Sequence, residues 1–360
     1  MSGGEGLRIL FAGGGTGGHV FPGIALAQHA VGSPVFWLCT SRAFDAAQLS
    51  KEGIPFEPLP SRRWSGLRGF LAPMARALRR AAARIREFRP DVVVGVGGYG
   101  TVPPVLAARA LGVPYVLLEQ NVRPGRANRF LAAGARRIYV QWAEAKAAFP
   151  GCGPRVRVTG SPLRRGMRRA DRAEALRRFG LEEGRPTVAV VGGSQGAEAL
   201  NRGVLAGLDG TADRIQLIHV AGAGRAEAVR SAYRERGARA VVCEFVADMD
   251  RLYSAADLVI SRAGAMAIAE MAALEVPAVL VPIARSAGDH QRENARAAAR
   301  TGGAIYLEEE ECLRGGLAPI LRRLVSGEPL FDNMRRRLRA LARPEAARTI
   351  LEDLGELFGG

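Results

Sequence analysis

Short runs of β-branched and aliphatic residues alternate along this chain with longer segments in which apolar residues recur at helical spacing. Strands separated by helix-length segments form βαβ units, whose strands pair in parallel. The pattern therefore predicts an α/β fold of two Rossmann-like, doubly wound parallel sheets, each binding ligands at the carboxyl ends of its strands. The predicted strands are Leu7–Ala12, Val35–Cys39, Val92–Val96, Tyr115–Leu118, Ile138–Gln141 and Val156–Thr159 in the first half, and Thr187–Val191, Gln216–Val220, Val241–Phe245, Leu258–Ser261, Ala278–Pro282 and Ala304–Leu307 in the second.

The division between the two halves is predicted at Gly160-Ser161-Pro162-Leu163, where glycine and proline interrupt the periodic pattern. We expect a first domain over residues 1–162 and a second over residues 163–335. An arginine-rich stretch from Phe331 to Leu357 has a helical pattern and no strand after it. Residues 336–360 are therefore expected to form a terminal helix, for which packing back on the first domain is one possibility.

Composition narrows the class of protein. Of the 360 residues, 48% are hydrophobic and 24% charged, which is typical of a globular chain. Apolar runs stay short of the roughly 18–20 residues that a spanning helix needs, and four scattered cysteines form no C-x-x-C pair. The net charge of +16 favours a polyanionic partner: nucleic acid, nucleotide phosphates or an anionic membrane surface.

Two glycine-rich turns, at residues 13–18 and 192–197, each follow a predicted strand and precede a predicted helix. Glycines let the backbone turn sharply and approach a ligand, and the N–H groups of the helix start attract anions. Gly13, Gly15 and Gly18 fit the dinucleotide pattern G-x-G-x-x-G. That pattern needs an acidic residue at the end of the second strand, where Arg42 stands instead, so an NADP enzyme is the weaker interpretation.

Two other short motifs are present. The second turn fits the hydrolase motif G-x-S-x-G, and His290 follows it in the order of a catalytic triad, but a hydrolase has no use for the first turn. Asp248-Met249-Asp250 has the D-x-D form of a metal site. Because it precedes a predicted helix, we expect the aspartates to cap that helix, and we expect no metal and no cofactor.

An ordered set of motifs resembles the MurG family, the N-acetylglucosaminyltransferases that complete the lipid-linked peptidoglycan precursor. The segment GGGTGGHVFPG at residues 13–23 looks like the opening of that family. The other motifs follow in family order over nearly the whole chain: Gly97-Gly98-Tyr99, Glu119-Gln120-Asn121 with Gly125 and Asn128, Gly160-Ser161-Pro162-Leu163-Arg164, GGSQGA at 192–197, Ser261-Arg262-Ala263-Gly264-Ala265 with Glu270, and Asp289-His290-Gln291 with Asn294.

The resemblance implies a GT-B glycosyltransferase whose two domains face a cleft. It implies inverting transfer of N-acetylglucosamine from UDP-GlcNAc to the muramyl sugar of a polyprenyl-pyrophosphate-linked peptide, lipid I to lipid II. The alternative is another UDP-sugar enzyme of this architecture, a glycolipid glycosyltransferase or a UDP-GlcNAc epimerase. Nucleic acid is not an expected partner, because the chain has no RNA- or DNA-binding signature. The expected location is peripheral, on the cytoplasmic face of the cell membrane.

The donor-binding residues come from the same resemblance. Ser194, Gln195 and Arg164 would hold the diphosphate, and Val246 would face the uracil edge. A carboxylate can accept from two hydroxyls, which suits Glu270 to the ribose. Gln291 would bond the transferred sugar. The full segment that would line the nucleotide is Ala265, Met266, Ala267, Ile268, Ala269 and Glu270.

On the acceptor side, the attacking hydroxyl must lose a proton, and His19 directly after the first turn is the candidate general base. Its alternative role is to hold an acceptor phosphate, and Glu119 is a second candidate base. Tyr99 and Asn121 match family positions that face the cleft. Thr16, Gly17 and Gly18 would line the acceptor or the donor sugar.

The segment Ser61–Leu71, which runs on into Met74–Arg80, mixes aromatic and aliphatic residues with arginines. Trp64, Leu67 and Phe70 with these arginines are predicted to dock on anionic lipid. The alternative is a buried amphipathic helix with a solvated basic face.

Overall fold

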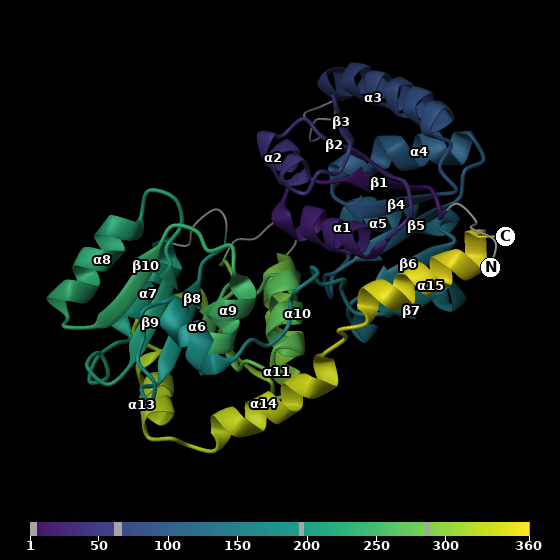
Figure 1. The fold of residues 1–360 in the computed structure, drawn as a ribbon. Coiled ribbons are helices and arrows are strands. Elements are labelled where there is room, and N and C mark those ends of the chain that lie inside the picture. Colours follow the sequence, from purple (N-terminus) through teal and green to yellow (C-terminus); the bar gives the residue numbers. More distant parts are fainter. Residues whose placement is uncertain (1–5, 61–66, 194–197, 285–288, 360) are drawn as a thin grey trace. The chain divides into compact units, whose positions relative to one another are not determined.

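A computed structural model describes residues 6–60, 67–193, 198–284 and 289–359, without the side chains of residues 67–71. Their contacts divide the chain into two compact units (Figure 1). The first comprises Met1–Arg165 with Arg343–Gly360, and the second comprises Gly166–Ala342.

The first unit is built on a seven-stranded parallel sheet in the order β3-β2-β1-β4-β5-β6-β7. The chain leaves β1 toward one edge and returns beside it at β4, so the switch point of the topology lies between β1 and β4. All residues of β1 and β4 are buried, as expected for strands with helices on both faces. The strands are β1 Ile9–Gly13, β2 Val35–Thr40, β3 Phe56–Leu59, β4 Val92–Gly97, β5 Tyr115–Glu119, β6 Arg137–Val140 and β7 Val156–Val158.

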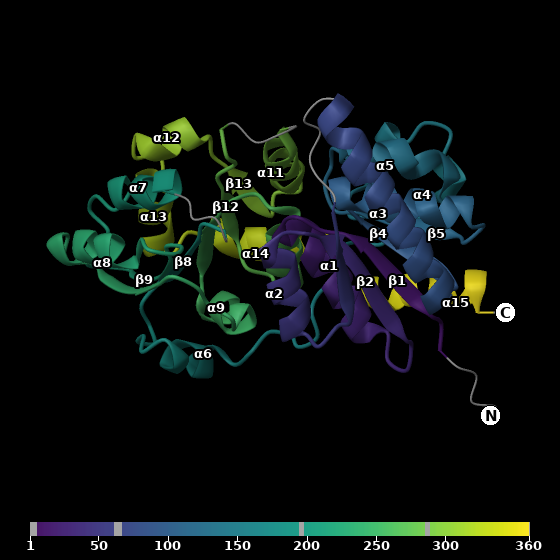
Figure 2. The same ribbon diagram turned by 90° about the horizontal axis from the view of Figure 1, so that it is seen from above.

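Helices cover both faces of this sheet (Figures 1 and 2). Apolar side chains of α1, α2 and α15 pack on one face, and those of α3, α4 and α5 pack on the other. The helices are α1 Gly17–His29, α2 Ala43–Lys51, α3 Leu67–Phe88, α4 Val102–Ala110, α5 Arg126–Leu131 and α15 Ala346–Phe358, with a short 3-10 helix η1 at Tyr99–Thr101 and another, η3, at Ala143–Ala148.

Strand β3 is missing from the sequence prediction, which gave six strands here. Its four residues, Phe-Glu-Pro-Leu, include a carboxylate and a proline. Proline is tolerated in an edge strand, and β3 lies at the edge of the sheet. Glu57 is held from outside the strand by Arg80 and Arg84 of α3, at 2.7 and 3.0 Å. The strand is thus stabilised by contacts distant in sequence, which no local pattern signals.

The second unit contains the six predicted strands in one parallel sheet of order β10-β9-β8-β11-β12-β13, with its switch point between β8 and β11. They are β8 Thr187–Val191, β9 Gln216–Val220, β10 Arg239–Cys243, β11 Leu258–Ser261, β12 Ala278–Leu280 and β13 Ala304–Tyr306. The helices are α6 Arg172–Arg178, α7 Glu198–Ala206, α8 Ala226–Glu235, α9 Met249–Ala255, α10 Ala265–Ala273, α11 His290–Arg300, α12 Glu309–Leu313, α13 Ala318–Val325 and α14 Leu330–Leu341.

The arginine-rich stretch at the end of the chain forms two helices and not one. They are separated at residues 342–345, where Pro344 cannot continue the helix. Helix α14 belongs to the second unit, so the expected boundary at 335/336 falls inside it. Helix α15 belongs to the first unit, where Ile350 and Leu354 are buried.

Side chains also fix α15 to the first sheet. Asp353 accepts hydrogen bonds from the Tyr139 hydroxyl at 2.6 Å and from Arg137 Nε at 3.0 Å. Of the helices that the structure describes, none combines the length and the apolar character that crossing a bilayer requires.

Candidate functional site

The first unit gathers its site residues at the switch point between β1 and β4. Strand β1 runs into Gly13, Gly14 and Gly15, whose φ angles of 123°, 142° and 94° lie in the region that favours glycine. Thr16 then forms the N-cap position of α1. Three successive glycines in this region turn the chain sharply from the strand into the helix.

His19 lies in the first turn of α1, with its Nδ1 3.0 Å from the Thr16 hydroxyl oxygen. Its ring packs against the backbone after β4. A Cβ added to Gly97 would lie 2.9 Å from His19 Cδ2, and one added to Gly98 would lie 3.2 Å from His19 Nδ1. These two glycines therefore make room for the imidazole, and the two strand ends meet at it.

Tyr99 extends this group of residues. A Cβ on Gly15 would lie 3.5 Å from Tyr99 Cε1, so the Tyr99 ring borders the first turn. Gly17 is packed, because a Cβ there would lie 2.9 Å from the Phe21 ring. At Gly18 a Cβ would meet only the Thr16 hydroxyl, at 3.9 Å. The structure thus brings Thr16, His19 and Tyr99 together.

Glu119, at the end of β5, is 3% exposed and holds the loop that follows it. Its carboxylate accepts from the N–H groups of Asn121 and Gly125, at 3.0 and 2.9 Å, and from the amides of Asn121 and Asn128, at 3.1 and 2.9 Å. Burial raises the pKa of the Glu119 carboxyl, and these hydrogen bonds oppose the rise. A carboxylate that accepts from four donors holds the loop in place. We therefore assign Glu119 to the structure of this loop and retain His19 as the candidate base.

The residues expected to hold the diphosphate are described only in part. Arg164 belongs to the first unit, where its guanidinium carbon lies 5.9 Å from the centre of the Phe21 ring in α1. Ser194 and Gln195 lie outside the described residues. The described contacts therefore place Arg164 beside the start of α1.

In the second unit, a buried arginine connects the ends of two neighbouring strands, β11 and β12. Arg262 follows β11, and its guanidinium donates to the carbonyls of Val281 and Pro282 after β12, at 3.1 and 3.3 Å. It also pairs with Glu309 of α12. Its Nε is buried without a hydrogen-bond partner among the described residues. Arg262 thus fixes the loops after β11 and β12 to one another.

Helix α10 begins at the end of this loop, with Gly264 as its N-cap residue. Of the segment expected to line the nucleotide, Ala265, Met266 and Ile268 are buried in the unit. Ala267, Ala269 and Glu270 are partly exposed, and Ala267 and Glu270, three residues apart, lie on one helix face. The Tyr253 hydroxyl donates to Glu270 Oε2 at 3.2 Å. Within this segment, a ligand can therefore reach the side chains of Ala267, Ala269 and Glu270.

Two further expected donor residues follow other strands of the second sheet. Val246 is partly exposed in the loop after the edge strand β10. Gln291, in the first turn of α11, accepts from the N–H of Ile283 at 3.1 Å through its Oε1. That contact uses the side-chain oxygen of Gln291 and not its amide NH2.

The D-x-D segment has a different arrangement from the expected cap. Asp248 occupies the N-cap position of α9, but its side chain makes no capping hydrogen bond. It forms an exposed ion pair with Arg178 of α6, at 3.3 Å. Asp248 thus stands at the N-cap position and Asp250 in the first turn, as expected, but the Asp248 side chain does not supply a capping hydrogen bond. Among the described residues, no group of three or more potential metal ligands comes together.

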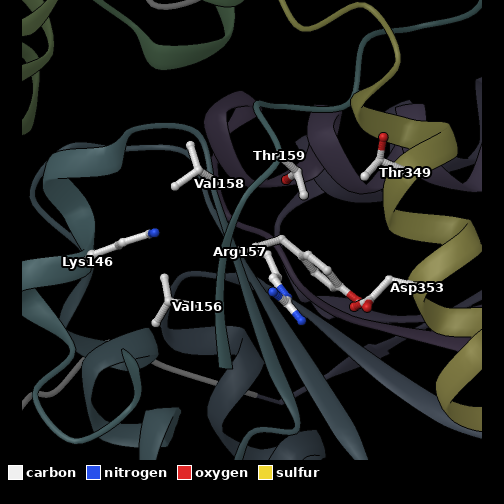
Figure 3. Close-up of a pocket in the computed structure, with 8 residues that line it drawn as sticks. Lys146, Val156, Arg157, Val158, Thr159, Thr349 and Asp353 are labelled. Carbon is white, nitrogen blue, oxygen red and sulfur yellow. The ribbon is translucent and has the colours of Figure 1, made fainter. Parts of the chain in front are cut away.

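A pocket of about 420 Å³ lies elsewhere in the first unit, around the edge strand β7 (Figure 3). Lys146 and Arg157 line it, but they lie on opposite sides of the strand, Lys146 with Val156 and Val158, and Arg157 toward Asp353. The two cations therefore do not converge on one ligand. None of the expected site residues lines this pocket.

Sequence reasoning missed three residues that organise the site. Arg262 stands inside a quoted motif, but nothing in the motif signals its burial. Tyr253 reaches Glu270 from α9, and Asp45 reaches the first glycine turn from α2, where its carboxylate accepts from the Gly15 N–H at 2.8 and 2.9 Å. Both contacts depend on the tertiary fold, so spacing along the chain could not reveal them.

Family models match both units. Residues 9–140 match the glycosyltransferase family 28 N-terminal domain, and residues 187–350 match the family's C-terminal domain. Together the two matches cover most of the chain.

Similar proteins extend the match to the full length. The UDP-N-acetylglucosamine–N-acetylmuramyl-(pentapeptide) pyrophosphoryl-undecaprenol N-acetylglucosamine transferase of Myxococcus xanthus is 36% identical over 96% of this chain and 92% of its own. The crystal structure of Acinetobacter baumannii MurG superposes with a TM-score of 0.79 at 28% identity, over 97% and 99% of the two chains. A Neisseria meningitidis UDP-GlcNAc 2-epimerase bound to UDP-GlcNAc has a TM-score of 0.69 over 97% and 100%, but its 14% identity shows a shared fold alone.

Proposed function

The chain belongs to the MurG family within glycosyltransferase family 28, and on that premise we propose how its residues carry out the transfer. It is a UDP-GlcNAc-dependent N-acetylglucosaminyltransferase that converts lipid I to lipid II, a step of peptidoglycan synthesis. The observation that carries this function is the identity, over nearly the whole chain, to a transferase of that name.

We propose that the second unit holds the donor. Glu270 accepts from the ribose hydroxyls, a role supported by its partly exposed position on α10. Val246 offers its backbone to the uracil edge, and Gln291 donates to the transferred sugar. The start of α10 favours the diphosphate, because the helix dipole is positive there. Ser194, Gln195 and Arg164 complete the set of proposed diphosphate ligands.

We propose that the first unit supplies the acceptor-side chemistry. The muramyl hydroxyl attacks C1 of the GlcNAc from the face opposite UDP, the C1–oxygen bond to UDP breaks, and the configuration at C1 inverts. His19 takes the hydroxyl proton. Thr16, Gly17, Gly18, Tyr99 and Asn121 line the sugars. The support for His19 is its place at the switch point, beside the Thr16 hydroxyl and against Gly97 and Gly98.

A transfer assay with labelled UDP-GlcNAc and a panel of lipid-linked acceptors tests the function. We expect label only on acceptors with a muramyl-peptide pyrophosphate head, at one label per acceptor. Label on a glycolipid without the muramyl sugar would identify a different glycosyltransferase. Appearance of a UDP-sugar epimer without any acceptor would identify an epimerase.

We also propose that the enzyme binds the membrane peripherally, at the cytoplasmic face, through α3 and the segment before it. Within the described side chains of α3, Ala77, Ala81 and Ile85 face the core, while Arg76, Arg79 and Arg86 are exposed. This is the basic face that an anionic surface attracts. Trp64 and the side chains of Leu67 and Phe70 lie outside the described residues. We propose these three residues as the apolar anchors.

Vesicle sedimentation tests this surface. Replacing Arg76, Arg79 and Arg86 with Gln should weaken binding to vesicles of anionic phosphatidylglycerol by roughly 1 kcal/mol per residue, and added salt should weaken binding of the wild type. Replacing Arg177 and Arg178 of the second unit is the charge control and should leave binding unchanged. Equal, weak binding of the wild type to neutral and anionic vesicles would contradict the proposal.

A further inference from the structure

Asp45 is a fully buried carboxylate that no part of the proposed chemistry uses. It lies in the first turn of α2, where the helix dipole stabilises an anionic group. Both of its oxygens accept from the Gly15 N–H, at 2.9 and 2.8 Å. One of them also accepts from the Thr40 hydroxyl at 2.5 Å and from the Thr40 N–H at 3.2 Å. The carboxylate thus ties the end of β2 to the turn after β1.

Other contacts hold the same turn from further sides. Arg42 donates to the Gly15 carbonyl at 2.7 Å, and the Trp37 indole donates to the Gly13 carbonyl at 3.0 Å. A Cβ on Gly14 would lie 2.4 Å from the Asp45 carboxylate, so the turn is packed directly on it. Backbone with three positive φ angles in succession keeps one conformation only when its surroundings define it. Asp45 supplies the buried acceptor that defines it at Gly15.

The hydrogen bonds of the turn also limit what it can bind. In a dinucleotide-binding turn the N–H groups face a phosphate. Here the Gly14 N–H points to the Gly97 carbonyl at 3.4 Å, and the Gly15 N–H points to Asp45. Arg42, at the position where an NADP enzyme can contact the 2′-phosphate, donates to the Gly15 carbonyl. A buried carboxylate behind the turn further disfavours an anion there. The N–H groups of Gly14 and Gly15 are therefore not directed at a bound phosphate.

We infer that Asp45 is a positioning residue of the transfer reaction: by fixing Gly15 it sets where Thr16 begins α1, and so where the His19 imidazole lies. The inference rests on the proposed role of His19 as the base. Thr16 and His19 follow Gly15 by one and four residues, and the Thr16 hydroxyl is 3.0 Å from His19 Nδ1. A change in the Gly15 conformation therefore displaces the imidazole relative to Gly97 and Gly98.

The test is Asp45→Asn, which keeps the shape but turns one acceptor oxygen into a donor facing other donors. We expect kcat to fall on the order of tenfold to a hundredfold, as for a displaced catalytic group, while the KM for UDP-GlcNAc changes less than about twofold. In a His19→Ala background, Asp45→Asn should lower kcat by less than about twofold further, because its effect passes through His19. An equal fall in both backgrounds, or no fall in the wild type, would overturn the inference.

Two controls separate positioning from stability. Asp353→Asn also removes a carboxylate with two partners in the first unit, and it should leave kcat unchanged. If Asp45→Asn does not fold, Thr40→Val removes the 2.5 Å bond to Asp45, together with the 3.4 Å contact from the Arg42 N–H, and should give a smaller loss with the same dependence on His19. Wild-type activity on the muramyl acceptor is measured first: its absence refutes the proposed function, whereas an active wild type with an unaffected Asp45→Asn refutes only the role of Asp45.

Discussion

The turn after β1 and the loop after β11 both lie at the switch point of their sheet, yet opposite charges hold them. In the first unit a buried acid, Asp45, holds Gly15. In the second a buried base, Arg262, holds the carbonyls of Val281 and Pro282 and pairs with Glu309. An acid behind a turn disfavours a bound anion, and a base favours it. The charge of the holding group therefore differs between the two switch points, and it supports the second unit as the site of the UDP diphosphate.

The largest expected effect is on the chemistry of the first unit. His19→Ala should lower kcat by roughly 10²- to 10⁴-fold, the usual contribution of a general base, and leave UDP affinity unchanged. His29→Ala is the matched control, because His29 lies at the other end of α1 and bonds only the Ala25 carbonyl among its described contacts. Steady-state kinetics and calorimetry with UDP measure the two quantities. A large loss of UDP affinity in His19→Ala would contradict the proposal that the second unit binds the donor.

Removing the buried base should destabilise the second unit. Arg262→Met leaves Glu309 without its partner, which costs about 3–5 kcal/mol for a buried pair. All three tryptophans, Trp37, Trp64 and Trp142, belong to the first unit, so circular dichroism should report the change in urea unfolding while tryptophan fluorescence reports little.

An exposed pair provides the control for Arg262. Arg178→Met, which breaks the pair with Asp248, should cost no more than about 1 kcal/mol. Equal effects of the two variants would show that burial of Arg262 contributes nothing to the stability of the second unit.

Donor binding should depend on Glu270. Glu270→Ala should raise the KM for UDP-GlcNAc roughly 30- to 150-fold, because a charge-assisted contact to the ribose is lost. This corresponds to about 2–3 kcal/mol of binding free energy. Tyr253→Phe removes the 3.2 Å bond to Glu270 and should have a smaller effect. The kcat at saturating donor should change little in both. Unaltered donor affinity in a folded Glu270→Ala would refute the ribose contact.

Acid should affect the second unit through His219, which is buried between the Tyr233 hydroxyl at 2.6 Å and Asn201 at 2.9 Å. Burial lowers the pKa of His219 to about 3. Below about pH 6.5 His219 is protonated in the unfolded chain and stays neutral in the folded chain. The free energy of unfolding therefore falls by about 1.4 kcal/mol per pH unit, down to about pH 3. Above pH 6.5 this contribution is absent.

The comparison of wild type with His219→Gln isolates this contribution from that of the carboxylates. The variant should lose less stability over the same pH window, in the circular dichroism transition that reports the second unit. Parallel curves for the two proteins would show that His219 takes up its proton in the folded state.

The smallest expected effect concerns metal. If helix starts and fixed donors neutralise the diphosphate, activity should survive exhaustive chelation, and Asp248→Asn should change kcat less than about twofold. The exposed pair of Asp248 with Arg178 supports this expectation. Loss of activity with chelator, restored by magnesium or manganese, would show that the D-x-D segment binds a cation.

Local sequence patterns predicted the strands that are determined by their own residue composition. Runs such as Val92–Val96 and Thr187–Val191 are buried parallel strands, as their β-branched composition indicates. Strand β3 was missed because Glu57 and Pro58 are tolerated only through its edge position and the arginines of α3. Asp45 was missed for the same reason: it is 30 residues from Gly15, and only the pairing of β1 with β2 brings α2 to the turn.

The return of α15 to the first sheet has a consequence for biosynthesis. Ile350 and Leu354 complete an apolar cluster that also contains Ile9, Phe11 and Ile24 from the beginning of the chain. A ribosome must therefore translate the whole second unit before the first can bury this surface. During that interval the apolar face of the sheet is open to chaperones, or to the sheet of another nascent chain. The second unit is uninterrupted in sequence from Gly166 to Ala342, so it can finish folding first, although it is translated later than most of the first unit.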